Sequence, residues 1–582
     1  MKSVLKVFIA VSFILIFISI LSVISFAASS IDYFIEGNNF FNSGKYQEAI
    51  DSYDKAIELD ADIPEFYYNK AIALYNLGRY DEAVVQYDQV IKLNPGFKDA
   101  YINKALCLTD MSKHDEALAL LEEYIKKYPN EQEGHALKGY NLLLKGSYEE
   151  AIEISNKVIE KKPNNKSLLS IAYSTKGAAL AELGKVDEAL EASKAALELD
   201  NTNVNAYIAM GYAFSIQKKY DEAIDACNKA IEMVPNCIEA YINKSVFLTG
   251  VKRYEEAIEC CDKASELNTT KDPNIESNIY TNRSVALFKM KKYNDALLAA
   301  EKALEYNPKS VSAYVSKGNA LLKEGKYEES IKALDKAIEL DSNCGDAYVS
   351  KSYSLEKLKR YDELIQICQK AINMNSKDPD YYSKVYLNWS CAYLRKENYS
   401  EAEKCLEKAL EYEPSDSEVL ALIYANYSSA MLGMSDYDKA LTFSDKALEL
   451  DPECYEGYAS KSLVLLELMK FDDALECCDI AIQKKIDGYE IHRIKGLAFE
   501  KKGMLDEALL ALDKSLELKP DDEEVKSERL RVSRKIFIRK ISLAAGIFLM
   551  VAVVAIIITI ILVKKRKKPI QRDGDDLYKG LV

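Results

Sequence analysis

Histidines, paired cysteines and short phosphate-binding motifs carry much of the catalysis and metal binding in proteins, and this chain offers few of them. Its 582 residues include three histidines, His114, His135 and His492. Its 12 cysteines contain no Cys-x-x-Cys pair, which disfavours a zinc site and thioredoxin-like chemistry. The sequence has no Gly-rich phosphate loop and no Gly-x-Ser-x-Gly elbow. We therefore expect no enzyme activity, no cofactor and no metal.

The net negative charge of the chain argues against one class of partner, nucleic acid. Lys and Arg number 77 against 92 Asp and Glu, a net charge of −15. An acidic chain disfavours nucleic acid as a partner, because no long-range attraction for phosphates exists. Hydrophobic residues make up 48% of the chain and tyrosines number 40, so the chain can build a packed core.

An internal repeat organises most of the sequence. A small or apolar residue, usually Ala, follows two polar residues at almost regular intervals. Nine of the thirteen intervals are 34 residues and the other four are 38 or 39. The fourteen anchor residues are Ala49, Ala83, Ala117, Ala151, Ala189, Ala223, Ala257, Ala296, Ser330, Leu364, Ala402, Ala440, Ala474 and Ala508.

Each repeat is expected to form two helices. In the repeat that begins at Pro64, Tyr67, Ala71 and Leu74 form one apolar stripe at helical spacing. Gly78 supplies the left-handed residue that ends this first helix, helix A. A second helix, helix B, follows around Ala83. Such a pair cannot bury both its faces alone, so neighbouring pairs must stack.

These residues resemble the tetratricopeptide repeat family, a 34-residue helix-turn-helix with an aromatic at position 4, a small residue at 8, Ala at 20 and Pro at 32. The resemblance covers fourteen units over residues 30–522 and implies an all-α, right-handed α-solenoid superhelix. Tyr replaces Trp at position 4, and Lys or Arg replaces an apolar residue at position 7 of ten units. The four longer intervals insert about one turn before helix A of the fifth, eighth, eleventh and twelfth units, and we expect them to lengthen that helix.

The repeat register also explains most of the reactive residues. His135 and His492 stand at position 4 and His114 at position 17, where other units carry Tyr, so all three are expected to pack. Most tyrosines at these two positions are expected to pack as well, although an aromatic ladder for a ligand is the alternative. Cysteines at positions 23 and 24 are expected to be free core thiols, with a disulfide framework as the alternative.

The family resemblance implies a groove lined by helix A that takes extended peptides or partner helices. Position 9 lines this groove in the family, and the candidate partner-binding residues at that position are Asn38, Tyr140, Tyr212, Asn319 and Tyr353. The apolar and aromatic lining favours proteins or peptides over small-molecule substrates. The family's carboxylate clamp is incomplete around Asn282.

Acidic residues at position 2 of seven units have two explanations. They could favour a basic partner, or they could simply complement the positive end of a helix dipole. The seven residues are Glu65, Asp99, Glu133, Glu239, Asp346, Glu456 and Glu490.

The two ends of the chain predict attachment to a membrane. Residues 1–27 form a signal peptide or an uncleaved signal anchor. Residues 541–563 carry no charge and are long enough for a transmembrane helix. Between them and the array, residues 523–540 form a basic, membrane-proximal capping helix. Residues 564–582 form a basic cytoplasmic tail.

We therefore expect a protein-interaction scaffold in the cell membrane, with one span and an extracytoplasmic array. One alternative is an adaptor of inverted topology whose array faces the cytoplasm. A second is the substrate-selecting part of an enzyme complex, although the residues left outside the repeats are too few for a catalytic domain.

Overall fold

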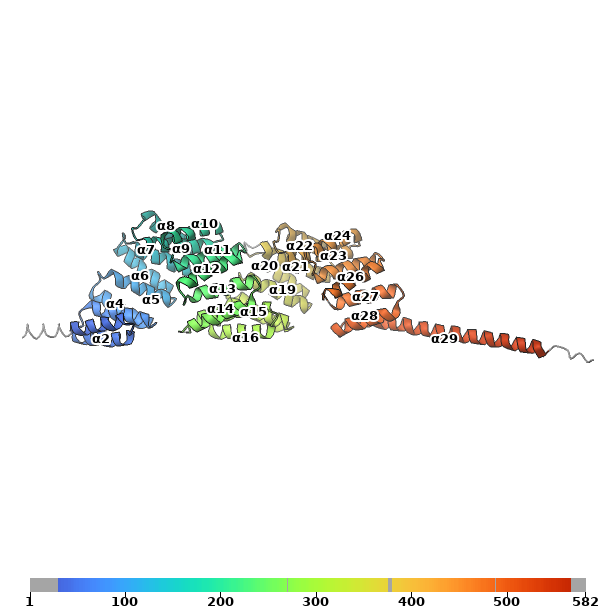
Figure 1. Cartoon of the computed structure of the whole chain (residues 1–582). Helices are drawn as coiled ribbons and strands as arrows, with labels where there is room; N and C mark the ends of the chain where they lie inside the picture. The colour runs from blue at the N-terminus through green and yellow to red at the C-terminus, as the bar shows by residue number, and fades with distance from the viewer. Residues whose placement is uncertain (1–29, 270, 375–378, 487, 567–582) are drawn as a thin grey trace, which may run out of the picture. The chain divides into compact units, whose positions relative to one another are not determined.

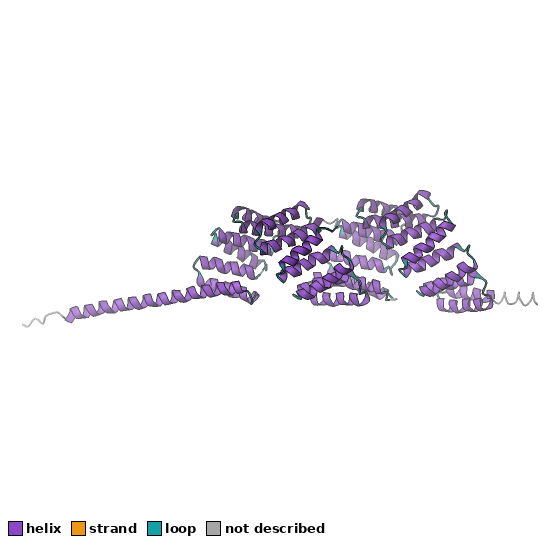
Figure 2. Ribbon diagram, turned by 180° about the vertical axis from the view of Figure 1, so that it is seen from behind, coloured by secondary structure: helices purple, strands orange, loops and turns teal. Residues whose placement is uncertain are grey.

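Paired helices make up the computed structural model, which describes residues 30–269, 271–374, 379–486 and 488–566. No strand occurs in these ranges (Figure 2). The all-α class and the helix-turn-helix repeat array are thus confirmed. The signal segment expected at residues 1–27 and the tail beyond residue 566 lie outside the described residues.

Fourteen helix pairs follow one another along the described chain (Figure 1). The first pair comprises a helix described over residues 30–42 and α2 (Tyr46–Leu59). Helix A of the later pairs is α3 (Pro64–Asn76), α5 (Lys98–Asp110), α7 (Gln132–Leu144), α9 (Lys166–Glu182), α11 (Val204–Ile216), α13 (Ile238–Gly250), α15 (Pro273–Lys289), α17 (Val311–Lys323), α19 (Gly345–Lys357), α21 (Pro379–Arg395), α23 (Ser417–Gly433), α25 (Tyr455–Glu467) and α27 (Tyr489–Lys501). Helix B is α4 (Tyr80–Leu93), α6 (His114–Lys127), α8 (Tyr148–Lys161), α10 (Val186–Leu199), α12 (Tyr220–Met233), α14 (Tyr254–Leu267), α16 (Tyr293–Tyr306), α18 (Tyr327–Leu340), α20 (Tyr361–Ala371), α22 (Tyr399–Glu411), α24 (Tyr437–Leu450), α26 (Phe471–Gln483) and α28 (Leu505–Leu518).

The described residues fall into two compact units. Unit 1 extends to Glu324 and ends with α17, and unit 2 begins at Gly325 with α18. The division therefore lies in the turn of the ninth repeat. Each unit is a stack of the same helix pairs, so the repeat chemistry described below applies to both.

The inserted residues lengthen helix A, as the interval lengths predicted. Helices α9, α15, α21 and α23 each have 17 residues. Helix A of an ordinary repeat, such as α3 or α11, has 13. Four residues add about one turn, so the insertion extends the helix and leaves the repeat intact.

A left-handed residue ends helix A in every repeat. Gly78 has φ +71°, as the sequence predicted for this turn. All fourteen repeats have a positive φ at the same position, but only six of them have Gly there. The others carry residues such as Lys359 (φ 59°) and Met469 (φ 58°). The turn geometry is thus common to all repeats, and eight of them bear the steric cost of a side chain in this conformation.

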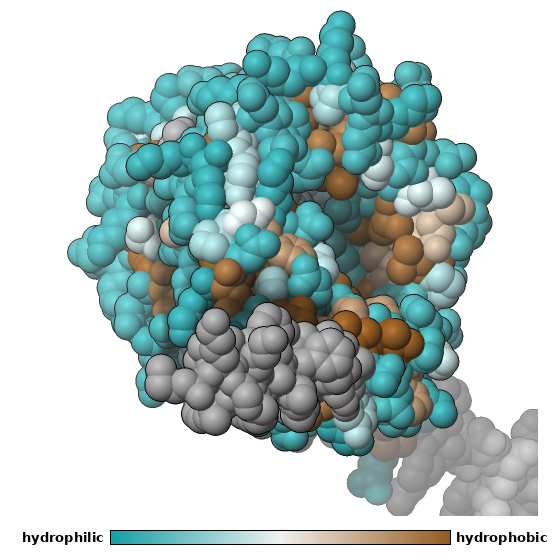
Figure 3. All heavy atoms as spheres, turned by 90° about the vertical axis from the view of Figure 1, so that its left-hand side faces the viewer, coloured by the Kyte–Doolittle hydropathy of each residue, from teal (hydrophilic) through white to brown (hydrophobic). Residues whose placement is uncertain are grey.

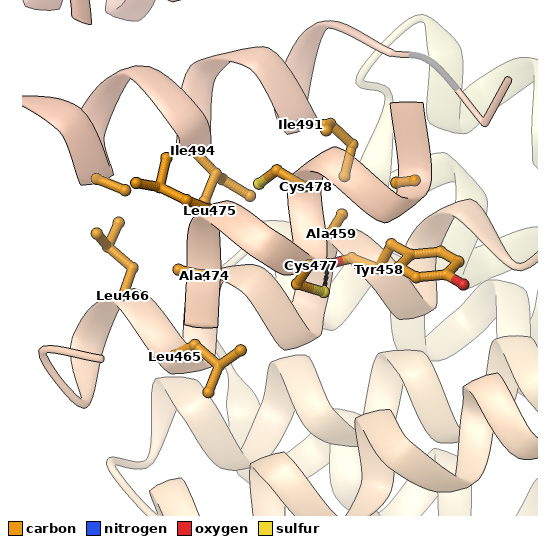
Figure 4. Close-up of a cluster of buried hydrophobic side chains, with 12 residues drawn as sticks. Tyr458, Ala459, Leu465, Leu466, Ala474, Leu475, Cys477, Cys478, Ile491 and Ile494 are labelled. Carbon is orange, nitrogen blue, oxygen red and sulfur yellow. Dashed lines mark hydrogen bonds between the residues drawn. The ribbon is translucent and has the colours of Figure 1, made fainter. Parts of the chain in front are cut away.

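Stacking of successive pairs completes the core. Figure 4 shows the cluster around the thirteenth repeat, where Leu465 and Leu466 from α25 and Ala474 and Cys478 from α26 meet α27. Ile491 of α27, which belongs to the next repeat, is fully buried in this cluster. One repeat alone would leave this surface in water, and burying each large aliphatic side chain stabilises the fold by about 2 kcal/mol.

Eight of the ten bases at position 7 form ion pairs between repeats, and Arg529, at the equivalent position after the last repeat, forms a ninth. Lys104 Nζ lies 2.6 Å from Asp88 Oδ1, which belongs to helix B of the preceding repeat. Nine such pairs join position 7 to position 25 of the repeat before: Asp54–Lys70, Asp88–Lys104, Glu122–Lys138, Asp262–Arg283, Glu301–Lys317, Asp335–Lys351, Asp445–Lys461, Asp479–Lys495 and Asp513–Arg529. We call this set the inter-repeat ion-pair ladder. It explains why this chain carries Lys where the family pattern has an apolar residue.

Helix α29 (Glu523–Arg566) closes the array and then continues as an apolar helix without a break. Its first turns imitate a fifteenth helix A, because Val525 and Val532 are fully buried against α28. Glu500 of α27 accepts hydrogen bonds from Arg531 Nη2 at 2.7 Å and Lys535 Nζ at 2.9 Å. The carboxylate of Glu500 is almost completely buried, so these bonds fix α29 to the last repeat.

The later part of α29 is long and apolar enough to cross a membrane, by length and composition. An eighteen-residue window within it has a mean hydropathy of 3.3, and none of that window is buried. The residues expected to span the membrane, 541–563, lie in this part of the helix. Side chains such as Phe548, which is 77% exposed, have no protein cover there.

Candidate partner-binding clefts

Unit 1 contains a cleft of about 370 Å³ between the first helices of three consecutive repeats. Helices α7, α9 and α11 supply most of its walls, and α13 supplies one end. We call it the unit 1 cleft. Its lining residues are Tyr140, Leu143, Leu144, Tyr148, Ser174, Thr175, Ala178, Glu182, Asn205, Ile208, Ala209, Tyr212, Glu239 and Asn243.

Unit 2 contains a corresponding cleft of about 390 Å³, the unit 2 cleft. It lies along α21, α23, α25 and α27, again the first helices of consecutive repeats. Its lining residues are Glu356, Cys391, Leu394, Arg395, Tyr399, Asn426, Ser429, Leu432, Gly433, Glu456, Ala459, Ser460, Leu463, Glu490, Arg493, Ile494 and Leu497.

Helical periodicity explains why these residues share one surface. Within α11, Asn205, Ile208, Ala209 and Tyr212 follow the spacing i, i+3, i+4, i+7 and therefore lie on one face. The same positions of α9 contribute Ser174, which places equivalent residues of successive repeats side by side. On the face drawn in Figure 3, hydrophobic residues gather in hollows within a mostly hydrophilic surface.

Two carboxylates in the unit 1 cleft have raised pKa values. Burial raises the pKa of the Glu182 carboxyl, although hydrogen bonds from Tyr212 and Tyr148 oppose this shift. The Tyr212 hydroxyl donates to Glu182 Oε2 at 3.3 Å. Burial also raises the pKa of Glu239, even though water reaches its side chain, because the concave wall surrounds it with protein.

Two tyrosines of the unit 1 cleft have raised pKa values, and the nearby carboxylates contribute to this shift. Burial and then the charge of Glu239 raise the pKa of Tyr140 to about 12. Burial and then Glu182 raise the pKa of Tyr212 to about 12. Both hydroxyls therefore stay protonated at physiological pH and remain hydrogen-bond donors.

The unit 2 cleft combines both signs of charge. Burial raises the pKa of Glu456. Arg493 already donates to Glu528 Oε1 at 2.8 Å and so belongs to the contact with α29. Arg395 has no carboxylate within 4 Å among residues that the structure describes, and the charges of Glu490 and Glu356 favour its protonated form, against the effect of burial.

The candidate residues at position 9 fall in different surroundings. Tyr140 and Tyr212 line the unit 1 cleft together. Asn38 Oδ1 accepts hydrogen bonds from Tyr53 and Asn69, at 2.8 Å each, and so links two repeats. Asn319, on α17, and Tyr353, on α19, do not line either cleft.

Sequence reasoning identified Tyr140 and Tyr212 but missed most of the other residues that line the unit 1 cleft, including two polar ones. Glu182 at position 13 and Tyr148 at position 17 belong to no pattern that marks a groove. Three of the seven acids at position 2, Glu239, Glu456 and Glu490, line a cleft. An acid at position 2 combined with an acid at position 13 of an earlier repeat would have been the available signal.

Most of the cysteines and one of the histidines are buried in the packing between helices. His492 is buried, and His114 Nδ1 lies 3.2 Å from Asn141 Oδ1. All twelve cysteines are unpaired thiols, and nine of them are buried. The described residues contain no group of three or more His, Cys, Asp or Glu side chains that could hold a metal ion.

Comparisons with known proteins agree with this architecture. Models described as TPR repeat or tetratricopeptide repeat match residues 37–78, 68–131, 103–166, 177–215, 204–237, 238–271, 383–416, 421–454 and 461–523. A model of anaphase-promoting complex, cyclosome, subunit 3 matches residues 289–371. Among curated proteins, no significant match is found.

Two solved structures are similar to this chain at low sequence identity. The crystal structure of the APC/C hetero-tetramer Cut9-Hcn1 is 15% identical, with a TM-score of 0.49, over 81% of this chain and 96% of that chain. The crystal structure of yeast Tom70 is 18% identical, with a TM-score of 0.40, over 72% of this chain and 99% of that chain. Fourteen helix pairs and repeat matches along most of the array lead to one conclusion: this chain belongs to the tetratricopeptide repeat family.

Proposed function

We propose that this protein is a membrane-tethered scaffold that binds protein partners in the unit 1 and unit 2 clefts. The observation that carries this proposal is the repeated placement of helix A side chains along two concave surfaces. Each surface combines apolar walls with a few convergent polar groups, which is the composition of a site for extended peptide. A binding role without catalysis of its own is the simplest function for such an array.

The tether is the apolar part of α29. A helix of 44 residues spans about 66 Å, of which residues 541–563 account for about 35 Å, enough for a hydrocarbon core of about 30 Å. Bases flank this segment on both sides, at Arg539 and Lys540 and at Lys564 and Lys565, where they can reach lipid headgroups.

The proposed orientation places the array outside the cytoplasm and residues 564–582 inside. Because both flanks of the span are basic, the charge rule alone does not decide the orientation. The signal-like composition of residues 1–27 favours export of the array.

Protease digestion of intact cells tests the orientation. An epitope tag within the loop at Asn307 should become accessible to added protease, and a tag after Val582 should become accessible only after lysis. A protected array in intact cells would support the inverted adaptor instead. Photocrosslinking from a cleft residue, Tyr212, tests partner binding, since the proposal requires a protein adduct that an outward-facing residue does not give.

A further inference from the structure

The unit 1 cleft has an unusual composition for a chain that is rich in lysine. Three of its fourteen lining residues are tyrosines, two are glutamates, and none is Lys, Arg or His. The ladder and the surface ion pairs neutralise many acids elsewhere in the chain, for example Glu232 through Lys229. The acids of this cleft have received no such partner.

Glu239 is the clearest case. It has no ion pair within 4 Å and no side-chain hydrogen bond among the residues that the structure describes. Its side chain is exposed on the wall of the cleft, where a ligand can reach it. A cation that entered the cleft could pair with this carboxylate, whereas an apolar group would leave it without a partner.

Glu182 supplies a second negative charge on the same surface. Its side-chain hydrogen bonds come from Tyr212 and Tyr148, both neutral donors, so its charge is oriented and not neutralised. Tyr140 and Tyr148 also line the cleft, and the other polar lining residues, Ser174, Thr175, Asn205 and Asn243, are neutral. Tyrosine rings attract a cation through their faces and carboxylates attract it through charge, so both components select the same ligand.

The remaining walls suit the stem of a long basic side chain. Leu143, Ile208 and Ala209 are apolar and line the same cleft. Lysine and arginine carry three or four methylene groups that pack on apolar surface while the charged head reaches a polar group. A hydrated metal ion gains nothing from such walls and needs about six oxygen ligands, more than these two carboxylates supply.

We propose that the unit 1 cleft is a pocket for the basic side chain of a lysine or arginine in an extended segment of a protein partner. Glu182 and Glu239 bind the charged head, Tyr140 and Tyr212 flank it, and Leu143 and Ile208 contact the stem. This inference rests on the proposed function and narrows it, because it names the chemistry of the partner. The pocket is negatively charged and binds a cation, whereas a site that binds carboxylates is positively charged.

The unit 2 cleft provides an internal comparison. Its three glutamates share the surface with Arg395 and Arg493, so a lysine or arginine would meet cations as well as anions there. The basic preference should therefore belong to the unit 1 cleft and not to both.

A peptide selection on the full-length protein tests this inference. Detergent-solubilised protein is immobilised through its C-terminus and exposed to a library of random, N-acetylated and C-amidated nonapeptides. We expect Lys and Arg to be enriched at least about fivefold over Met at one position of the bound peptides. Simultaneous Glu182→Gln and Glu239→Gln substitution should abolish the enrichment.

Glu65→Gln is the matched control, because Glu65 occupies the same repeat position as Glu239 but lines neither cleft. It should leave the enrichment unchanged. The double variant should keep the thermal unfolding midpoint of the parent or exceed it, because neutralising Glu239 removes an unpartnered charge. That measurement separates loss of the pocket from loss of the fold.

The possible outcomes distinguish the inference from the function on which it rests. Bound peptides without enrichment of Lys or Arg would overturn the pocket and leave peptide binding intact. Enrichment that survives the double substitution would also overturn it, since the cation would bind elsewhere. If no peptide bound at all, both the pocket and the proposed function would be contradicted.

Discussion

Lys104 Nζ and Asp88 Oδ1 lie 2.6 Å apart across the junction of two successive repeats, and eight further junctions contain an ion pair at the same two repeat positions. No junction places two like charges at these positions. Where Lys194 replaces the acid, Met210 replaces the base sixteen residues later, so two like charges never meet. The ladder thus acts between helix B of one repeat and helix A of the next, away from the clefts.

Breaking one pair of the ladder should cost little stability and should depend on salt. A double-mutant cycle with Lys104→Met and Asp88→Asn should give a coupling of about 0.5–1 kcal/mol, because the lysine is mostly covered but the aspartate is half exposed. Hydrogen exchange of the amides of α4 and α5 measures it.

The matched control for this pair is Lys244→Met, since the residue sixteen positions before Lys244 is Asn228 and carries no charge. The coupling between Lys104 and Asp88 should decrease in 1 M salt. A coupling energy near zero in low salt would show that the Lys104–Asp88 ion pair does not stabilise the contact between repeats.

Glycine should stabilise the turns that now contain another residue type. Met469 has φ 58° and is 75% exposed, so its side chain contributes little packing while its backbone is strained. Met469→Gly should stabilise α25 and α26 by about 1 kcal/mol. The reverse substitution, Gly78→Ala at φ +71°, should destabilise its own repeat by a similar amount. Slower amide exchange in the first variant and faster exchange in the second are the expected results; faster exchange in both would show that the turn is not strained.

Docking of α29 should depend on Glu500. Although burial raises the pKa of this carboxyl, hydrogen bonds from Arg531 and Lys535 outweigh it, and the net pKa is lowered. A lowered folded-state pKa means that the contact stabilises above the usual range for Glu and is lost as pH falls through the lowered value. Glu500→Gln should therefore weaken docking by about 1–2 kcal/mol at neutral pH and make it insensitive to acid.

Proteolysis of the α28–α29 junction measures this docking. Cleavage after Lys519 should accelerate in Glu500→Gln, whereas Glu517→Gln, at an exposed site, should have no effect. Equal cleavage rates in the parent and in Glu500→Gln would show that Val525 and Val532 alone hold the helix.

Acid should weaken binding of basic peptides while it stabilises the cleft itself. The pKa values of Glu182 and Glu239 are raised, so both carboxyls gain protons above the usual range for Glu. Protonation removes the attraction for a cation, and no other cleft residue except the tyrosines titrates. The free protein should change in the opposite direction, because a raised folded-state pKa stabilises at low pH and this contribution is lost as pH rises. Fluorescence anisotropy of a bound lysine peptide between pH 7.5 and 5 measures the first effect; affinity that does not change with pH would contradict it.

Much of the fold could be predicted from the sequence because the repeat restates the same physical constraints fourteen times. Helix pairs, the left-handed turn at Gly78 and the longer α9 all follow from periodicity and local steric rules. The clefts could be predicted only in part. Tyr140 and Tyr212 share a repeat position, but Glu182, the last residue of α9, enters the cleft through its contact with Tyr212 of the next repeat, which no single repeat encodes.

The role of position 7 was also beyond prediction from one repeat. Lys104 has no partner within its own 34 residues, because Asp88 belongs to the repeat before. Spacing of sixteen residues between an acid and a base becomes informative only when helix B and the following helix A are known to pack. The packing of helix B against the next helix A therefore explains the base at position 7, which the family pattern does not.

Photocrosslinking from the cleft wall in native membranes tests the central claim most directly. A photoreactive phenylalanine replaces Tyr212 in the full-length protein, and the control replaces Leu298, an outward residue of α16 that is 65% exposed. Binding of a protein segment in the unit 1 cleft predicts a discrete adduct from position 212, competed by a lysine peptide and absent from position 298. Adducts of equal yield from both positions, or none from position 212, would contradict the account.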